Sequence, residues 1–125
     1  MKLLIDTSAI IDYINGDEKI LHIMDGADDV RTSSLCAYET LIGASGNKVA
    51  ERFMADLSPF PFTFRDSRRA ADIYRLISKK GKTVNVVDIL IYAQAIERGL
   101  SILTKDNDFS LINNVVKGNL DVVKP

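Results

Sequence analysis

With 125 residues, 46% of them hydrophobic and 26% charged, the chain can bury a substantial core and has the composition of a soluble globular protein. Its single cysteine excludes an internal disulfide, and no apolar run approaches the roughly 20 residues of a membrane helix. The first residues do not resemble a signal peptide. We therefore expect a single domain over residues 1–125 that is cytoplasmic and does not bind a membrane.

The net charge of −1 hides an asymmetry between the two halves of the chain. Residues 1–64 carry 10 acidic and 5 basic side chains, whereas residues 65–125 carry 7 acidic and 11 basic ones. The basic excess is concentrated between Arg65 and Lys82, where seven Lys and Arg accompany two Asp. Such a segment could attract a phosphate backbone or could be a solvated helix face, and the charge pattern alone favours the second reading.

In the first half of the chain, short apolar runs alternate with segments of helical periodicity. The run KLLI after the first methionine is typical of a strand buried on both faces. Asp6 or Thr7 can cap the helix that follows, and Gly16 can end it. In chain order we expect a strand at 2–5, helices at 7–16 and 17–27, a strand at 30–34, and helices at 35–45 and 48–57.

The second half repeats this alternation. The stretch PFPFTF fits a short strand at the edge of a sheet, where proline is tolerated. We expect that strand at 59–64, a basic helix from 65 to Gly81, an apolar helix at 84–99, and strands at 101–104 and 121–124. Strands that alternate with helices predict an α/β fold, in which helices cover both faces of a mainly parallel central sheet.

Two of these strands end in acidic residues. Asp6 follows the first strand directly, and Asp106 follows the strand SILT after one lysine. Because the carboxyl ends of parallel strands meet at one edge of a sheet, both aspartates should lie at that edge, where ligands bind in folds of this class.

Two further acids lie within apolar helical stretches. On a helix, Glu39 has only apolar or small neighbours at three and four residues' distance, and Asp88 is the only charge between Val84 and Ile96. Each of these acids could have a structural role instead: Asp6 as a helix cap, Asp106 or Asp108 in a turn, Asp88 as a partner of an arginine, and Glu39 at the edge of the core.

Together, however, the acids predict a metal site. Burying several unpaired carboxylates is expensive, and a divalent cation removes the cost by supplying the opposite charge. Oxygen ligands suit Mg²⁺ or Mn²⁺. The only histidine, His22, is on a different helix and lacks ligand spacing, so zinc is not expected.

At these residues the sequence resembles the PIN domain family, and within it the VapC-type toxins. LLIDTSAIIDYI is similar to the opening strand, first aspartate and helix of the family, and SSLCAYETLIGA to the helix that carries its second acid. The stretch GKTVNVVDILIYAQAIERGLSILTKDNDF resembles an aspartate-bearing helix followed by a strand that ends in Thr-x-Asp. The resemblance covers nearly the whole chain and implies a three-layer α/β/α sandwich.

The resemblance also implies a metal-dependent endoribonuclease that leaves 5′-phosphate and 3′-hydroxyl ends. Its acidic site would be Asp6, Glu39, Asp88 and Asp106. Asp6 and Asp106 would be the principal metal ligands, Asp88 would ligate directly or through water, and Glu39 would bind a second metal or accept a proton from water. Supporting groups would be the hydroxyls of Ser8 and Thr104, and Asp108 as an outer ligand or a helix cap.

Partners follow from the same resemblance. Members of this kind commonly form homodimers and are inhibited by a VapB-type antitoxin whose C-terminal segment reaches the acidic groove. Because an acidic pocket repels RNA, basic residues must hold the substrate; we expect this of Arg65, Arg68, Arg69 and Lys79 in the basic helix, or of Lys105 beside the site.

Two other classes of protein are compatible with parts of the pattern. A Mg²⁺-binding receiver domain also gathers acids at strand ends, but it needs an acidic pair after its first strand, where this chain has Asp-Thr-Ser. A non-catalytic PIN-like interaction module would keep the fold without the chemistry, and the complete acidic set disfavours it.

Overall fold

The structure is a computed structural model that describes all 125 residues. Its centre is a sheet of four parallel strands in the order β2-β1-β3-β4. The strands are β1 (Lys2–Ile5), β2 (Asp29–Arg31), β3 (Ser101–Leu103) and β4 (Val122–Val123). The three apolar residues of β1 are fully buried, as their continuous run predicts for an inner strand.

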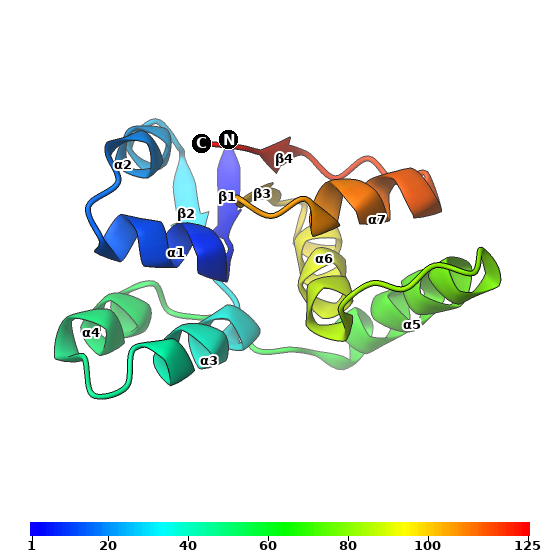
Figure 1. Cartoon of the computed structure of the whole chain (residues 1–125), viewed down its shortest axis with the longest axis horizontal. Coiled ribbons are helices and arrows are strands. Elements are labelled where there is room, and N and C mark those ends of the chain that lie inside the picture. The colour runs from blue at the N-terminus through cyan, green and yellow to red at the C-terminus, as the bar shows by residue number, and fades with distance from the viewer.

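Seven helices cover the sheet. They are α1 (Thr7–Ile14), α2 (Glu18–Asp25), α3 (Ser34–Gly43), α4 (Lys48–Asp56), α5 (Phe64–Lys79), α6 (Val86–Arg98) and α7 (Asp108–Val116). Figure 1 shows α1 to α4 on one side of the strands and α5 to α7 on the other. A cluster of 25 buried hydrophobic residues fills the space between these layers. The predicted α/β class and parallel sheet are therefore confirmed.

The order of the strands creates a switch point in the middle of the sheet. From β1 the chain continues through α1 and α2 to β2 on one side, whereas from β3 it continues through α7 to β4 on the other. The crevice beyond the carboxyl ends of β1 and β3 is therefore where this type of sheet binds ligands. In Figure 1 the first turns of α1, α3 and α7 face this central region.

The turn between α6 and β3 is short, because α6 ends sharply at Gly99 and β3 begins at Ser101. Gly99 has a left-handed φ of 64°, its N–H donates to Ile96, and the N–H of Leu100 donates to Ala95. This is the hydrogen-bond pattern of a Schellman motif, which ends a helix sharply, and glycine adopts its left-handed conformation without strain.

Two details differ from the prediction. Residues 59–64 do not form a strand: Phe60 makes only an isolated parallel bridge with Ser33, and α5 already begins at Phe64, because Thr63 and Asp66 form a capping box. The helix α7 was not predicted. Its buried residues Phe109 and Ile112 have helical spacing, but its asparagines and valines have low helix propensity.

None of the seven helices combines the length and the hydrophobicity that crossing a bilayer requires.

Candidate metal centre

Three carboxylates meet at the carboxyl edge of the sheet. Asp88 lies in the first turn of α6, Asp106 in the loop after β3, and Asp108 at the first position of α7. Each offers an oxygen, and these three oxygens lie within 4.8 Å of one another. None of the ion pairs in the structure involves these residues. The negative charges of the cluster are therefore not balanced by basic side chains.

Asp6 is linked to Asp106 of this cluster through Thr104 and is almost completely buried, with 3% of its surface exposed. Its Oδ2 accepts hydrogen bonds from Thr104 Oγ1 at 2.9 Å and from Ser8 Oγ at 3.3 Å. The same Thr104 oxygen accepts from the backbone N–H of Asp106 at 2.9 Å, and Ser8 Oγ accepts from the N–H of Lys105 at 3.1 Å. These two hydroxyls thus connect the end of β1 to the loop after β3.

The acids disturb one another's protonation. Burial, then the neighbouring carboxylate of Asp108, and then the charges of Asp6 and Asp106 raise the pKa of Asp88 to about 8. Burial also raises the pKa of Asp6, although its hydrogen bonds from Thr104 and Thr7 oppose the change. Without a cation, the cluster therefore resists carrying its full negative charge at neutral pH.

Glu39 is close to Asp6 in the fold but lies outside the group of three. It is half-buried on α3, and its Oε1 accepts a hydrogen bond from Thr7 Oγ1 at 2.9 Å. Thr7 immediately follows Asp6, so α3 reaches the site through the start of α1. The predicted part of Glu39 in proton transfer or metal binding stays a prediction.

Cys36 is a neighbour of the site that the sequence argument did not use. Its Sγ lies 4.0 Å from Asp6 Oδ1 and can donate to it. Burial, followed by the charge of Asp6, raises the pKa of this thiol to about 11, so that it remains protonated. Its place near the site could have been predicted from the sequence, because Cys36 lies three residues before Glu39 and therefore on the same face of α3.

A comparison with protein-family models gives a match over almost the full length of the chain. The model of the PIN domain family matches residues 3–115. The chain belongs to the PIN domain family. No sequence among curated proteins matches it.

Solved structures with this fold include toxin–antitoxin complexes. VapBC2 from Rickettsia felis, bound to a DNA fragment from its promoter, contains a chain that is 19% identical, with a TM-score of 0.81; the match covers 100% of this chain and 99% of that one. FitAcB from Neisseria gonorrhoeae is 20% identical, with a TM-score of 0.76; the match covers 96% of this chain and 95% of that one. VapBC-5 from Mycobacterium tuberculosis is 23% identical, with a TM-score of 0.72; the match covers 98% of this chain and 95% of that one. At these identities the likeness establishes the fold.

The predicted basic residues are not gathered at the acids of this PIN domain. Arg65 and Arg69 pair with Glu97, at N–O distances of 3.4 and 2.7 Å. Glu97 is in the last turn of α6, nine residues after Asp88, which corresponds to about 14 Å along the helix axis. Arg68 lines the same polar hollow as these arginines, and this group therefore lies at the far end of α6 from the acids.

The other two basic candidates differ from each other. Lys79 is exposed at the last position of α5. Lys105 is next to the acids in sequence, but its Nζ lies 2.8 Å from Asp12 Oδ2 on α1. Of the five predicted RNA-binding residues, Lys105 alone is therefore adjacent to the acidic site, and its charge is partly balanced.

The donor set of this PIN domain fits a hard divalent cation. The three clustered groups are all carboxylates, and neither a histidine nor a thiol joins them. A bound cation would favour the ionised form of each acid and would remove the repulsion that raises the pKa of Asp88. The residues present are thus suited to Mg²⁺ or Mn²⁺.

Proposed function

We propose that this PIN domain is a Mg²⁺- or Mn²⁺-dependent endoribonuclease and the toxin of a VapBC-type toxin–antitoxin pair. The observation that carries the proposal is the cluster of Asp88, Asp106 and Asp108 at the carboxyl edge of the sheet, whose side chains form no ion pair. Asp88 and Asp108 are half-buried and Asp106 is exposed, and like charges gathered this closely repel one another unless a cation neutralises them.

In this proposal the chain divides the work between ligands and the groups that orient them. Asp88, Asp106 and Asp108 would hold the metal, with Asp6 behind them as a further negative group. The metal would lower the pKa of a bound water and neutralise charge on the scissile phosphate. Thr104 would keep Asp6 and Asp106 in register, because its hydroxyl contacts both residues.

Glu39 is the residue best suited to accept a proton from the attacking water. It is only half-buried, and Thr7 holds its carboxylate in place through one oxygen, leaving the other available. No alternative base of another type is present, because His22 lies on α2, outside the site.

Helix ends add a favourable field to the site. Asp88 and Asp108 lie in the first turns of α6 and α7, where the helix dipole and free N–H groups stabilise negative charge. The same field would favour the phosphate of a substrate once a cation has neutralised the carboxylates.

For the RNA itself, we assign two separate contact regions. Lys105 would contact the chain near the cut, and the arginines at the end of α6 would contact nucleotides farther away, with Lys79 extending this basic face of α5. The separation of about 14 Å along α6 corresponds to a few nucleotides. Binding by these arginines would then matter for long RNA and not for very short RNA.

Likeness in fold to VapBC complexes supports a VapB-type antitoxin as a partner. A homodimer is proposed from the resemblance of the sequence to VapC-type toxins alone. A groove between α1, α2 and α4 offers an apolar surface for the antitoxin, lined mainly by Tyr13, Ile14, Leu21, Val49 and Phe53. A segment bound there could continue along α1 towards the acids at its start.

The decisive experiment is cleavage of matched single-stranded RNA and DNA by the purified chain with added Mg²⁺ or Mn²⁺. We expect cleavage of RNA only, 5′-phosphate products, and a loss of about 100-fold or more in Asp88→Asn. Asp25→Asn, which changes an exposed aspartate on α2, is the matched control and should retain wild-type activity. Equal cleavage by wild type and Asp88→Asn would refute the proposal, and absence of both metal binding and cleavage in the wild type would favour the non-catalytic module.

A further inference from the structure

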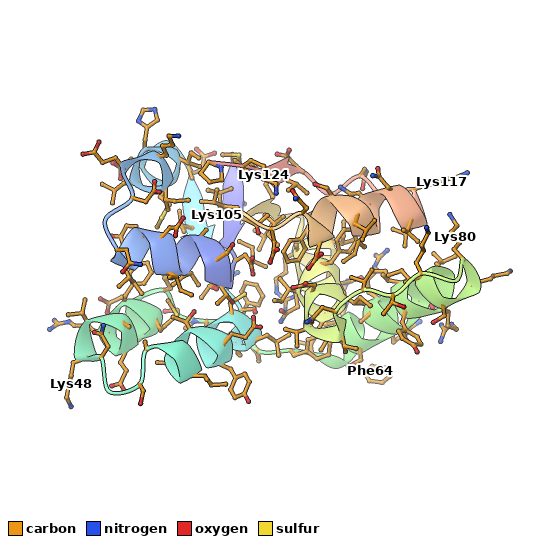
Figure 2. All side chains as sticks on the ribbon, in the orientation of Figure 1. Lys48, Phe64, Lys80, Lys105, Lys117 and Lys124 are labelled. Atoms are coloured by element: carbon orange, nitrogen blue, oxygen red, sulfur yellow. The ribbon has the colours of Figure 1, made fainter.

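The strand β4 brings a lysine to the loop that carries two of the clustered acids. β4 pairs in parallel with β3, with Val123 opposite Leu103, and the N–H of Thr104 donates to Val123 at 3.1 Å. The residue after β4 is Lys124, which therefore reaches the same edge of the sheet as the loop after β3. In Figure 2, Lys124 and Lys105 lie beside each other where the chain passes from β3 to α7.

All three N–H donors of Lys124 find acceptors in this loop. Its Nζ donates to the carbonyl of Lys105 at 3.2 Å, to the carbonyl of Asp106, and to Oδ1 of Asn107 at 2.9 Å. An ammonium group has three protons, so these three contacts satisfy it completely. Lys124 is exposed, yet it is held by three consecutive residues of one loop.

The contact to Asn107 has a specific effect on α7. Asn107 occupies the N-cap position of this helix, but its side chain caps no N–H; instead, its oxygen accepts from Lys124. The carbonyl of Asn107 accepts from the N–H of Leu111 at 3.0 Å and so begins the helix. Fixing Asn107 therefore fixes the position of Asp108, the first residue of α7.

We propose that Lys124 is a positioning residue for the metal centre: it clamps the loop 105–107 so that Asp106 and Asp108 converge on one cation. The inference rests on the proposed function. Lys124 lies outside the residues 3–115 that match the family model, so it is a feature of this chain beyond that match. Apart from Lys124, the loop is held by the hydroxyls of Ser8 and Thr104 and by the ion pair of Lys105 with Asp12 on α1.

A role of Lys124 in positioning can be distinguished from a role of its charge alone, because the two predict opposite changes in the affinity for a cation when Lys124 is replaced. Removing a positive charge beside an acidic site strengthens the binding of a cation by simple electrostatics. Loosening the loop weakens it, because the ligands must then be ordered at the cost of conformational entropy. Replacement of Lys124 by an uncharged residue therefore separates the two roles.

The test is calorimetric titration of Mn²⁺ into wild type, Lys124→Met, Lys124→Arg and the control Lys48→Met. Lys48 is an exposed lysine at the start of α4, distant from Lys124 in Figure 2. We expect Lys124→Met to bind Mn²⁺ about tenfold more weakly, at the low end for groups that orient metal ligands. Lys124→Arg retains charge and donors and should recover most of the affinity, and Lys48→Met should match the wild type.

A second measurement, made without metal, is amide hydrogen exchange at Asp106. Its N–H is bonded to Thr104 Oγ1, and exchange should become several-fold faster in Lys124→Met but not in Lys48→Met. Unchanged or tighter Mn²⁺ binding by Lys124→Met, or unchanged exchange at Asp106, would overturn the inference. Failure of the wild type to bind Mn²⁺ would instead mark the failure of the proposed function itself.

Discussion

The two ends of α6 place a carboxylate in opposite surroundings. At its first turn, Asp88 faces other carboxylates and no cation. At its last turn, Arg98 forms a bidentate pair with Asp66, with N–O distances of 2.7 and 3.0 Å. The guanidinium also lies 4.2 Å from the centre of the Phe60 ring and donates to the carbonyl of Pro61.

The protonation of the two acids reflects this difference. Burial opposes the ionisation of Asp66, but hydrogen bonds from Arg98 and from the N–H of Thr63 outweigh it and hold the pKa of Asp66 below its ordinary value of 3.8. At the other end, burial and like charges raise the pKa of Asp88. One end of the helix therefore stabilises the fold, whereas the other end leaves an unfavourable charge pattern that a ligand can relieve.

The substitution Arg98→Ala removes the ion pair at the last turn of α6. This change leaves Asp66, which is 1% exposed, without its charge partner, and we expect a loss of about 3–5 kcal/mol in the free energy of unfolding. Urea denaturation measures the effect. Arg75→Ala is the control, because Arg75 pairs with Asp72 on the exposed surface, and it should cost about 1 kcal/mol or less. Similar losses in both variants would mean that the buried pair has no special part in stability.

The two ends should also respond oppositely to pH in protein kept free of metal with a chelator. Folded Asp88 keeps its proton to about pH 8 but loses it near 3.8 when unfolded, so its contribution to stability falls as pH rises between these values. Asp66 contributes fully above 3.8, and its contribution is lost as pH falls through its lower folded value.

Variants at each end separate these contributions. Asp88→Asn should be more stable than wild type by on the order of 1 kcal/mol at pH 8 and equal to it near pH 4. Asp66→Asn should be less stable than wild type at neutral pH, with the difference shrinking in acid. Denaturation curves over this pH range test both expectations, and a gap between wild type and Asp88→Asn that does not depend on pH would contradict the account of the acidic end.

The smallest expected effect is that of a substitution at Arg68, on the surface near the last turn of α6. Arg68 forms no ion pair, so Arg68→Glu should leave stability nearly unchanged. Under the proposed function it should weaken the binding of long single-stranded RNA by a few-fold and reduce the salt dependence of binding, because phosphate contacts release counterions. A binding titration at several salt concentrations measures this, with a trinucleotide as the short substrate that should be unaffected. Equal affinity for long RNA would exclude Arg68 as a contact.

Part of the arrangement of the acids could be predicted from local pattern. Asp6 and Asp106 follow parallel strands, so the geometry of the sheet predicts that they lie at one edge, and Asp88 is conspicuous as a charge in an apolar helix. The roles of these acids stay predictions. The partnership of Asp66 with Arg98 could not be predicted, because 32 residues separate them and many surface arginines offer the same chemistry.

Other features depend on packing in three dimensions. The place of Asp108 in the cluster follows from the entry angle of α7, a helix whose propensity is weak. The clamp formed by Lys124 requires the register of β4, a strand of two residues that sequence alone defines poorly. The Pro-flanked segment before α5 remained irregular because its capping box begins the helix before a strand can extend.

The hydrogen bond between Thr104 and Asp6 joins positions separated by 98 residues. A ribosome must therefore synthesise residues 6 to 104 before the crevice beyond β1 and β3 can close, and a product interrupted before Asp106 lacks two of the three clustered acids. Under the proposed function, the chain gains activity only after Asp108 has been synthesised, which leaves the cell the preceding part of translation in which to have an inhibitor ready.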